Sequence, residues 1–87
     1  MQIIASISIL TSNRQKNSPA LNKVLTDSGH LIMARMGVNV QKTCTESCPG
    51  LIILALKAES GEINELFEKL NKIEDLEAKI SIFEEKF

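Results

Sequence analysis

The chain has 87 residues, 44% of them hydrophobic and 24% charged, which suits one folded domain and is too short for two hydrophobic cores. The formal net charge of −1 leaves no basic surplus for the phosphates of DNA or RNA. No stretch approaches the ~20 continuous apolar residues of a membrane helix, and the N-terminus does not look like a signal peptide. We therefore expect a single cytoplasmic domain, residues 1–87, that binds neither nucleic acid nor membranes directly.

The first expected element is a strand over residues 2–11, because polarity alternates along it. Its inward face carries Ile3, Ala5, Ile7 and Ile9. A helix follows and ends near Gly29. Its start is open between two readings: Ser18 as N-cap with Pro19 at the first helical position, or an earlier start at Asn13.

The middle of the chain contains two expected strands and a polar stretch between them. Residues 31–40 predict a strand whose inward apolar residues are Ile32, Ala34, Met36, Val38 and Val40. The polar residues 41–50 include both cysteines. Residues 51–58 are apolar on both faces, which is typical of a strand in the centre of a sheet.

A second helix and a last strand complete the predicted fold. Ser60 and Gly61 precede a helix whose apolar stripe is Ile63, Leu66, Phe67, Leu70 and Ile73. Asp75 marks a turn before a strand over residues 76–83, with Leu76, Ala78, Ile80 and Ile82 facing inward. The order strand, helix, strand, strand, helix, strand predicts an α+β, ferredoxin-like βαββαβ fold, with a four-stranded antiparallel sheet and two helices on one face.

Two helices can cover only one face of such a sheet. The other face is expected to carry apolar side chains interrupted by serines and by Arg35, namely Ile4, Leu10, Leu31, Met33 and alternate residues of the third strand. An apolar patch of this kind usually marks an interface, so we expect a homodimer or homotetramer. Tolerable, scattered exposure is the alternative.

The two cysteines form a Cys-x3-Cys pair, Cys44 and Cys48, in the polar loop. Together with His30, one chain supplies at most three soft metal ligands, and His30 is expected at the opposite end of the second strand. A complete zinc site would therefore need two chains. Three readings stay open: a metal site, a redox pair, or two surface thiols in a hairpin loop.

Arg35 and Gly37 are candidate ligand-binding residues. Arg35 is predicted in the middle of a strand, on the sheet face away from the helices, where an arginine needs an anion from the chain, another subunit or a ligand. Gly37, two residues on, leaves space for an approaching backbone or ligand. The alternative is an exposed arginine whose stem covers apolar surface. No catalytic motif or nucleophile–base arrangement stands out, so we expect no enzyme.

Five short motifs resemble those of one family. They are Asn13-Arg14 before the first helix, the strand His30-Leu-Ile-Met-Ala-Arg-Met-Gly-Val-Asn-Val40, Gly50-Leu-Ile-Ile at the third strand, the helical set Ile63, Leu66, Lys69 and Leu70, and Lys79 in the last strand. Over about residues 3–82, the chain resembles the ACT-like proteins described as regulators of the iron-only hydrogenase system. Asn39, Glu68 and Asn71 depart from the proline and glycines of that pattern, and Cys44 and Cys48 are not part of it.

The resemblance implies an ACT-like, ferredoxin-like domain that is a homo-oligomer with a regulatory role. It also implies similarity in fold to the C-terminal domain of nickel-responsive regulators, which bind metal and assemble through that domain. Effectors of ACT-like domains usually bind at subunit interfaces near the first strand–helix loop, which makes Asn13 and Arg14 candidates beside Arg35 and Gly37.

The leading hypothesis is therefore a ligand-sensing regulatory module of the kind found as an effector domain in transcription regulators, here without a DNA-binding segment of its own. Its effector would be a small molecule or a metal. One alternative is a metal-binding or redox protein that uses Cys44 and Cys48. The other is an oligomeric assembly adaptor that binds no ligand.

Overall fold

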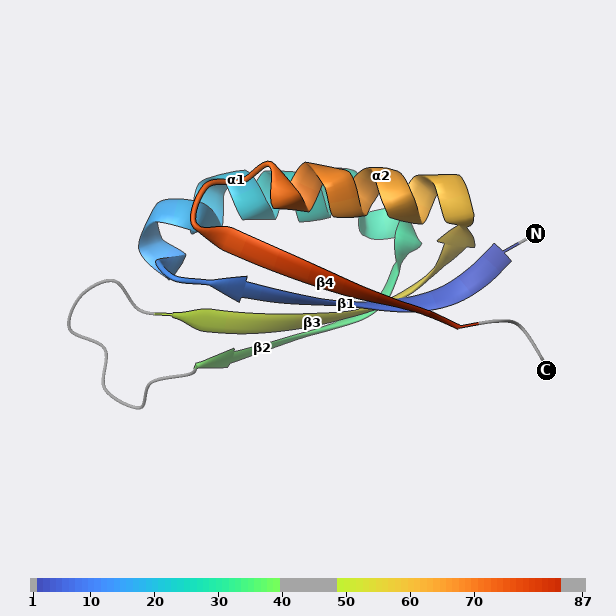
Figure 1. The fold of residues 1–87 in the computed structure, drawn as a ribbon, viewed down its shortest axis with the longest axis horizontal. Coiled ribbons are helices and arrows are strands. Elements are labelled where there is room, and N and C mark those ends of the chain that lie inside the picture. The colour runs from blue at the N-terminus through green and yellow to red at the C-terminus, as the bar shows by residue number, and fades with distance from the viewer. Residues whose placement is uncertain (1, 40–48, 84–87) are drawn as a thin grey trace.

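The four strands form one antiparallel sheet in the order β2-β3-β1-β4, and both helices lie on the same face of it (Figure 1). The computed structural model describes residues 2–39 and 49–83. Along the chain the elements are β1 (Gln2–Thr11), α1 (Arg14–Asp27), a short 3-10 helix η1 (Gly29–Leu31), β2 (Ile32–Asn39), β3 (Gly50–Glu59), α2 (Ser60–Asn71) and β4 (Leu76–Phe83). The predicted ferredoxin-like fold class is confirmed.

The hydrophobic core lies between the helices and the sheet. The two central strands supply its floor, where Ile7 of β1 pairs with Leu54 of β3 and both are fully buried. Apolar residues one helical turn apart supply its roof: Leu21 and Leu25 from α1, and Ile63, Leu66 and Leu70 from α2. Burial of each such side chain contributes roughly 1.5–3 kcal/mol, so the period-2 and period-3.6 patterns of the sequence determine which faces meet.

Helix α1 begins at the earlier of the two predicted positions. The side chain of Asn13 accepts a hydrogen bond from the backbone N–H of Lys16 at 3.2 Å, which makes Asn13 the N-cap. Pro19 consequently lies inside the helix. Because proline has no N–H, the helix lacks one backbone hydrogen bond in its second turn.

The predicted orientation of the second strand is wrong from its third residue onward. The register of β2 against β3 shifts between Ile32 and Ala34, which is a β-bulge at Met33. One extra residue turns every following side chain to the other face of the sheet. Arg35 therefore lies opposite Leu54, on the helix-covered face, and not on the face away from the helices.

The same bulge changes the composition of the uncovered face. Met36 and Val38, predicted to face inward, are 55% and 43% exposed and pair with outward residues of β3. Leu31, predicted on the uncovered face, is buried in the core from its place in η1. We call this surface the open face. Its apolar residues are Ile4, Leu10, Ala34, Met36, Val38, Leu51, Ile53, Ala55 and Phe83.

Candidate functional site

The loop between β1 and α1 is fixed to the turn between α2 and β4, and the two lie at the same end of the molecule (Figure 1). Buried Asn17 is the central link. Its Oδ1 accepts a hydrogen bond from the hydroxyl of Thr11, and its Nδ2 donates to the backbone carbonyl of Glu74 at 2.5 Å. The first turn of α1 is thereby held in place by a residue far away in the sequence.

Exposed contacts reinforce this link. The backbone N–H and the hydroxyl of Ser12 both donate to the carbonyl of Asp75, at 3.1 and 3.2 Å. The Nζ of Lys16 lies 3.0 Å from Oδ2 of Asp75 and 3.6 Å from Oε2 of Glu74. The hydrogen bond and charge of Asp75, with a smaller contribution from Glu74, raise the pKa of Lys16 above its ordinary value of 10.5. We call the contacts of Thr11, Ser12, Lys16 and Asn17 with Glu74 and Asp75 the polar strap.

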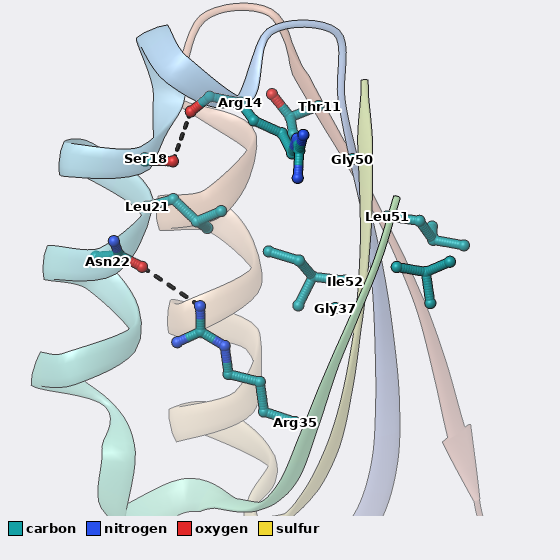
Figure 2. Close-up of a pocket in the computed structure, with 11 residues that line it drawn as sticks. Thr11, Arg14, Ser18, Leu21, Asn22, Arg35, Gly37, Gly50, Leu51 and Ile52 are labelled. Carbon is teal, nitrogen blue, oxygen red and sulfur yellow. Dashed lines mark hydrogen bonds between the residues drawn. The ribbon is translucent and has the colours of Figure 1, made fainter. Parts of the chain in front are cut away.

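A cleft of about 290 Å³ lies between α1 and the helix-covered side of β2 and β3 (Figure 2). Helix α2 packs closely on β1, β3 and β4, whereas α1 lies less close to the strands. The described residues that line it are Thr11, Arg14, Ser18, Leu21, Asn22, Arg35, Gly37, Val38, Gly50, Leu51 and Ile52. We call it the α1–β2 cleft.

Arg14 enters the cleft from the first turn of α1, and its stem crosses directly over Gly50 at the start of β3. A Cβ atom at position 50 would lie 2.5 Å from Cδ and 2.7 Å from Cγ of Arg14. Gly50 therefore provides the space in which the stem of Arg14 lies. The Nε atom of Arg14 is buried.

Arg35 enters from the opposite wall. Its Nη2 donates to Oδ1 of Asn22 on α1 at 3.3 Å, so the side chain spans the mouth of the cleft (Figure 2). Gly37 follows on the same side of β2, and a Cβ atom there would meet nothing within 4 Å. Figure 2 shows the two guanidinium groups on the same side of β3, with Leu21 and Ile52 between them.

Three of the four predicted ligand-binding residues, Arg14, Arg35 and Gly37, thus line one cleft. Asn13 does not line it and instead caps α1. Sequence reasoning missed Ser18 and Asn22, although positions 14, 18 and 22 follow the i, i+4, i+8 spacing of one helix face. Given Arg14 as a candidate, this spacing identifies Ser18 and Asn22 as the residues of α1 that share its helix face and line the cleft.

The remaining candidates do not join this site. Cys44 and Cys48 lie outside the described residues. His30 lies in η1, where its Nε2 is 3.6 Å from Oε2 of Glu62. Within residues 2–39 and 49–83, no group of three or more His, Cys, Asp or Glu is placed to hold a metal ion, and neither helix is long and apolar enough to cross a membrane.

The charge of the α1–β2 cleft differs from that of the chain. Its described lining carries two arginines and no aspartate or glutamate, whereas the whole chain has a formal net charge of −1. Hydroxyl groups of Thr11 and Ser18 and the amide of Asn22 add hydrogen-bonding groups. The hydroxyls of Thr11 and Ser18 donate within the chain, to Oδ1 of Asn17 and to the backbone carbonyl of Arg14. Chemically, the described lining combines two cationic side chains with apolar ones.

Known structures share this fold. The uncharacterized protein TM1266 from Thermotoga maritima is 23% identical and has a TM-score of 0.86, over 97% of this chain and 100% of that one. The de novo designed protein Foldit4 has a TM-score of 0.54 at 11% identity, over 99% of this chain and 100% of that one. These likenesses show the fold alone, because one fold supports unrelated functions. A comparison with curated proteins finds no significant match.

A family model gives the assignment. The model "TM1266-like: Iron-only hydrogenase system regulator, putative" matches residues 3–80. The match includes β1, both helices, β2 and β3, and therefore every described residue of the cleft. It confirms the resemblance drawn from the short sequence motifs. The chain belongs to the TM1266-like family.

Proposed function

We propose that the chain is a ligand-responsive regulatory module whose effector binds in the α1–β2 cleft. One observation carries the proposal: Arg14 of α1 and Arg35 of β2 line a single cleft of about 290 Å³, and Gly37 of β2 lines it as well. The described lining combines two guanidinium groups with apolar side chains, a combination suited to binding and orienting a small ligand. We therefore expect binding without turnover.

The family description supports a regulatory role for such binding. A regulator needs a site whose occupancy changes a structural element that a partner can sense. Arg35 lies on β2, which is an edge strand of the sheet. The residue after Arg35, Met36, is exposed on the open face. A ligand held by Arg35 would therefore contact the strand that also contributes to the open face.

We further infer that a second copy of the chain covers the open face. Its apolar residues lie mainly on β2, β3 and β1, while Glu77 and Lys79 of β4 lie on the same face beside them. These two residues have opposite charge and are two positions apart, so a two-fold axis can bring each beside the other in the partner. That self-complementarity is what an isologous homodimer requires.

The experiment that tests the effector site is a thermal-shift screen of the reduced protein against amino acids, nucleotides and divalent metals. Binding to the native state raises the midpoint temperature, by roughly 4–8 °C for each kcal/mol in a domain of this size. We expect a dose-dependent shift that is lost in Arg35→Ala and kept in Lys72→Ala, which removes an exposed positive charge at the end of α2, away from both the cleft and the open face.

Two outcomes would contradict the effector cleft. One is a screen in which no compound shifts the transition. The other is a metal shift that persists in Arg35→Ala and disappears in Cys44→Ser, which would favour the cysteine loop as the functional site.

A further inference from the structure

A hollow of about 200 Å³ lies in the open face, where β3, β1 and β4 run side by side. The described residues that line it are Ser8, Leu10, Leu51, Glu77 and Lys79. Ser8 has the shortest of these side chains, and its partners across the two strand pairs, Ile53 and Lys79, are longer. We call this feature the Ser8 hollow.

Leu10 projects beside the Ser8 hollow. It lies two positions from Ser8 on the same face of β1 and is 46% exposed. A single exposed leucine is ordinary on a protein surface. Here, however, one surface supplies both a projecting leucine and, next to it, a space. An apolar cavity of about 150 Å³ holds benzene, and a leucine side chain is smaller. Such a surface can be complementary to itself, as a contact between identical copies requires.

The two-fold relation inferred from Glu77 and Lys79 determines which residues meet. Within the sheet, Leu10 is paired with Glu77, and Ser8 is paired with Lys79. These pairs form two adjacent rows across β1 and β4. A two-fold axis that lies between the stacked sheets and runs across the strands, between the two rows, exchanges one row with the other. It therefore brings Leu10 opposite Ser8 of the second copy when it brings Glu77 opposite Lys79.

Other two-fold axes through the hollow give poorer contacts. An axis parallel to the strands, between β1 and β4, would set Leu10 against the carboxylate of Glu77. A diagonal axis would set Lys79 against Lys79, or Glu77 against Glu77, and like charges repel. Within one chain Glu77 and Lys79 already lie 3.8 Å apart, so the axis across the strands joins two ion pairs and needs no unpaired charge.

We propose that Leu10 of each copy fills the Ser8 hollow of the other copy. The two contacts are equivalent by symmetry, and each hollow is completed by a residue of the second copy. Glu77 and Lys79 border the hollow on its β4 side. This inference rests on the proposed second copy at the open face, and it names the residues that specify the contact.

Exchanging the two residue types tests the contact. Leu10→Ser leaves both hollows of the dimer empty and is expected to weaken it about a hundredfold or more, because two leucines are no longer buried. Ser8→Leu sets leucine against leucine and is expected to weaken it about tenfold or more. Both positions are exposed in the single copy, so neither change disturbs the core. Asn64→Leu, on the exposed side of α2, should leave the dissociation constant within about twofold. Sedimentation equilibrium of the full chain measures all four proteins.

The two weakened variants are complementary to each other. The Ser8→Leu chain has leucine at positions 8 and 10, and the Leu10→Ser chain has serine at both. In a mixed dimer each of the two contacts again joins one leucine to one serine. We expect an equimolar mixture to form a heterodimer with nearly wild-type affinity, and native mass spectrometry distinguishes it from either homodimer by mass. Recovery on mixing also shows that both variants are folded.

Two results would overturn the inference and leave a second copy on the open face: variants that dimerise as the wild type does, or two folded, weakened variants that do not recover on mixing. A wild-type chain that is monomeric at every concentration would overturn the second copy as well. The effector cleft is tested separately, by the thermal-shift screen.

Discussion

Gly50 shows how one residue determines the geometry of the cleft. The stem of Arg14 lies where any side chain at position 50 would begin. The backbone there does not require glycine, since no glycine among the described residues has a positive φ. The need for glycine comes from the close approach of another side chain, and this is why the Gly50 motif and the Arg14 motif, far apart in the sequence, belong to one site.

The contact between Gly50 and Arg14 gives a prediction in the form of a double-mutant cycle. Gly50→Ala should lower the free energy of unfolding by about 1–3 kcal/mol, the usual cost of an added group in a packed site. In an Arg14→Ala background the same change should cost much less, because the atoms that clash are gone. Urea unfolding of the four proteins measures the coupling.

Gly37→Ala is the matched control for this cycle. It also adds one methyl group to a strand beside the cleft, but in open space. It should change stability by about 0.5 kcal/mol or less, as surface substitutions usually do. A cost for Gly50→Ala that is the same with and without Arg14 would show that the contact is not its cause.

At the scale of elements, the periodicity of the sequence predicts where the strands and helices lie, but it does not predict which way the side chains of β2 face. The strands and helices were located because apolar residues recur at spacings of 2 and 3.6. The bulge in β2 was missed because apolar residues occur on both sides of that strand, so either orientation of Arg35 fits the pattern. Arg35 was therefore chosen as a ligand-binding candidate on the wrong face.

The polar strap was also beyond prediction from the sequence. Its contacts join residues near position 15 to residues near position 75, and each residue alone looks like an ordinary loop or helix polar residue. Only the folded chain brings the two turns together. The strap holds the first turn of α1, which carries Arg14, so its role extends to the cleft.

The strap predicts a specific loss of stability. Asn17→Ala removes a buried side chain that joins Thr11 to the carbonyl of Glu74. We expect a loss of about 1–3 kcal/mol, because buried polar partners are left unsatisfied, and a fall in midpoint temperature of roughly 4–8 °C per kcal/mol. Asn22→Ala, at an exposed position of the same helix, should have a much smaller effect. Equal effects would mean that the strap does not stabilise the fold.

At the scale of the whole molecule, β2 connects two surfaces of different character. Alternate residues face different sides of the sheet: Arg35 and Gly37 line the α1–β2 cleft, while Ala34 and Met36 contribute to the apolar open face. If a second copy covers the open face, a ligand that changes β2 can change the affinity between copies. By linkage, assembly would then change the affinity for the ligand by the same factor.

Assembly through the open face is the last prediction, and sedimentation velocity tests it. We expect the wild-type chain to be a concentration-dependent dimer or a dimer of dimers. Met36→Glu places a charge in the centre of the apolar surface and should give a monomer, because an unpaired charge is costly to bury. Asn64→Glu adds the same charge on the exposed side of α2 and should leave the assembly unchanged.

Exchanging the charges of Glu77 and Lys79 then distinguishes a specific two-fold contact from non-specific association through an apolar surface. Glu77→Lys and Lys79→Glu alone should each weaken the dimer, since like charges would meet across the axis. The double exchange restores opposite charges in both copies and should recover the dimer. Within one chain the two groups are exposed and 3.8 Å apart, and such a surface pair contributes little to folding. Recovery of the dimer would therefore come from the contact between copies. A wild-type chain that is monomeric at every concentration would contradict the prediction that a second copy covers the open face.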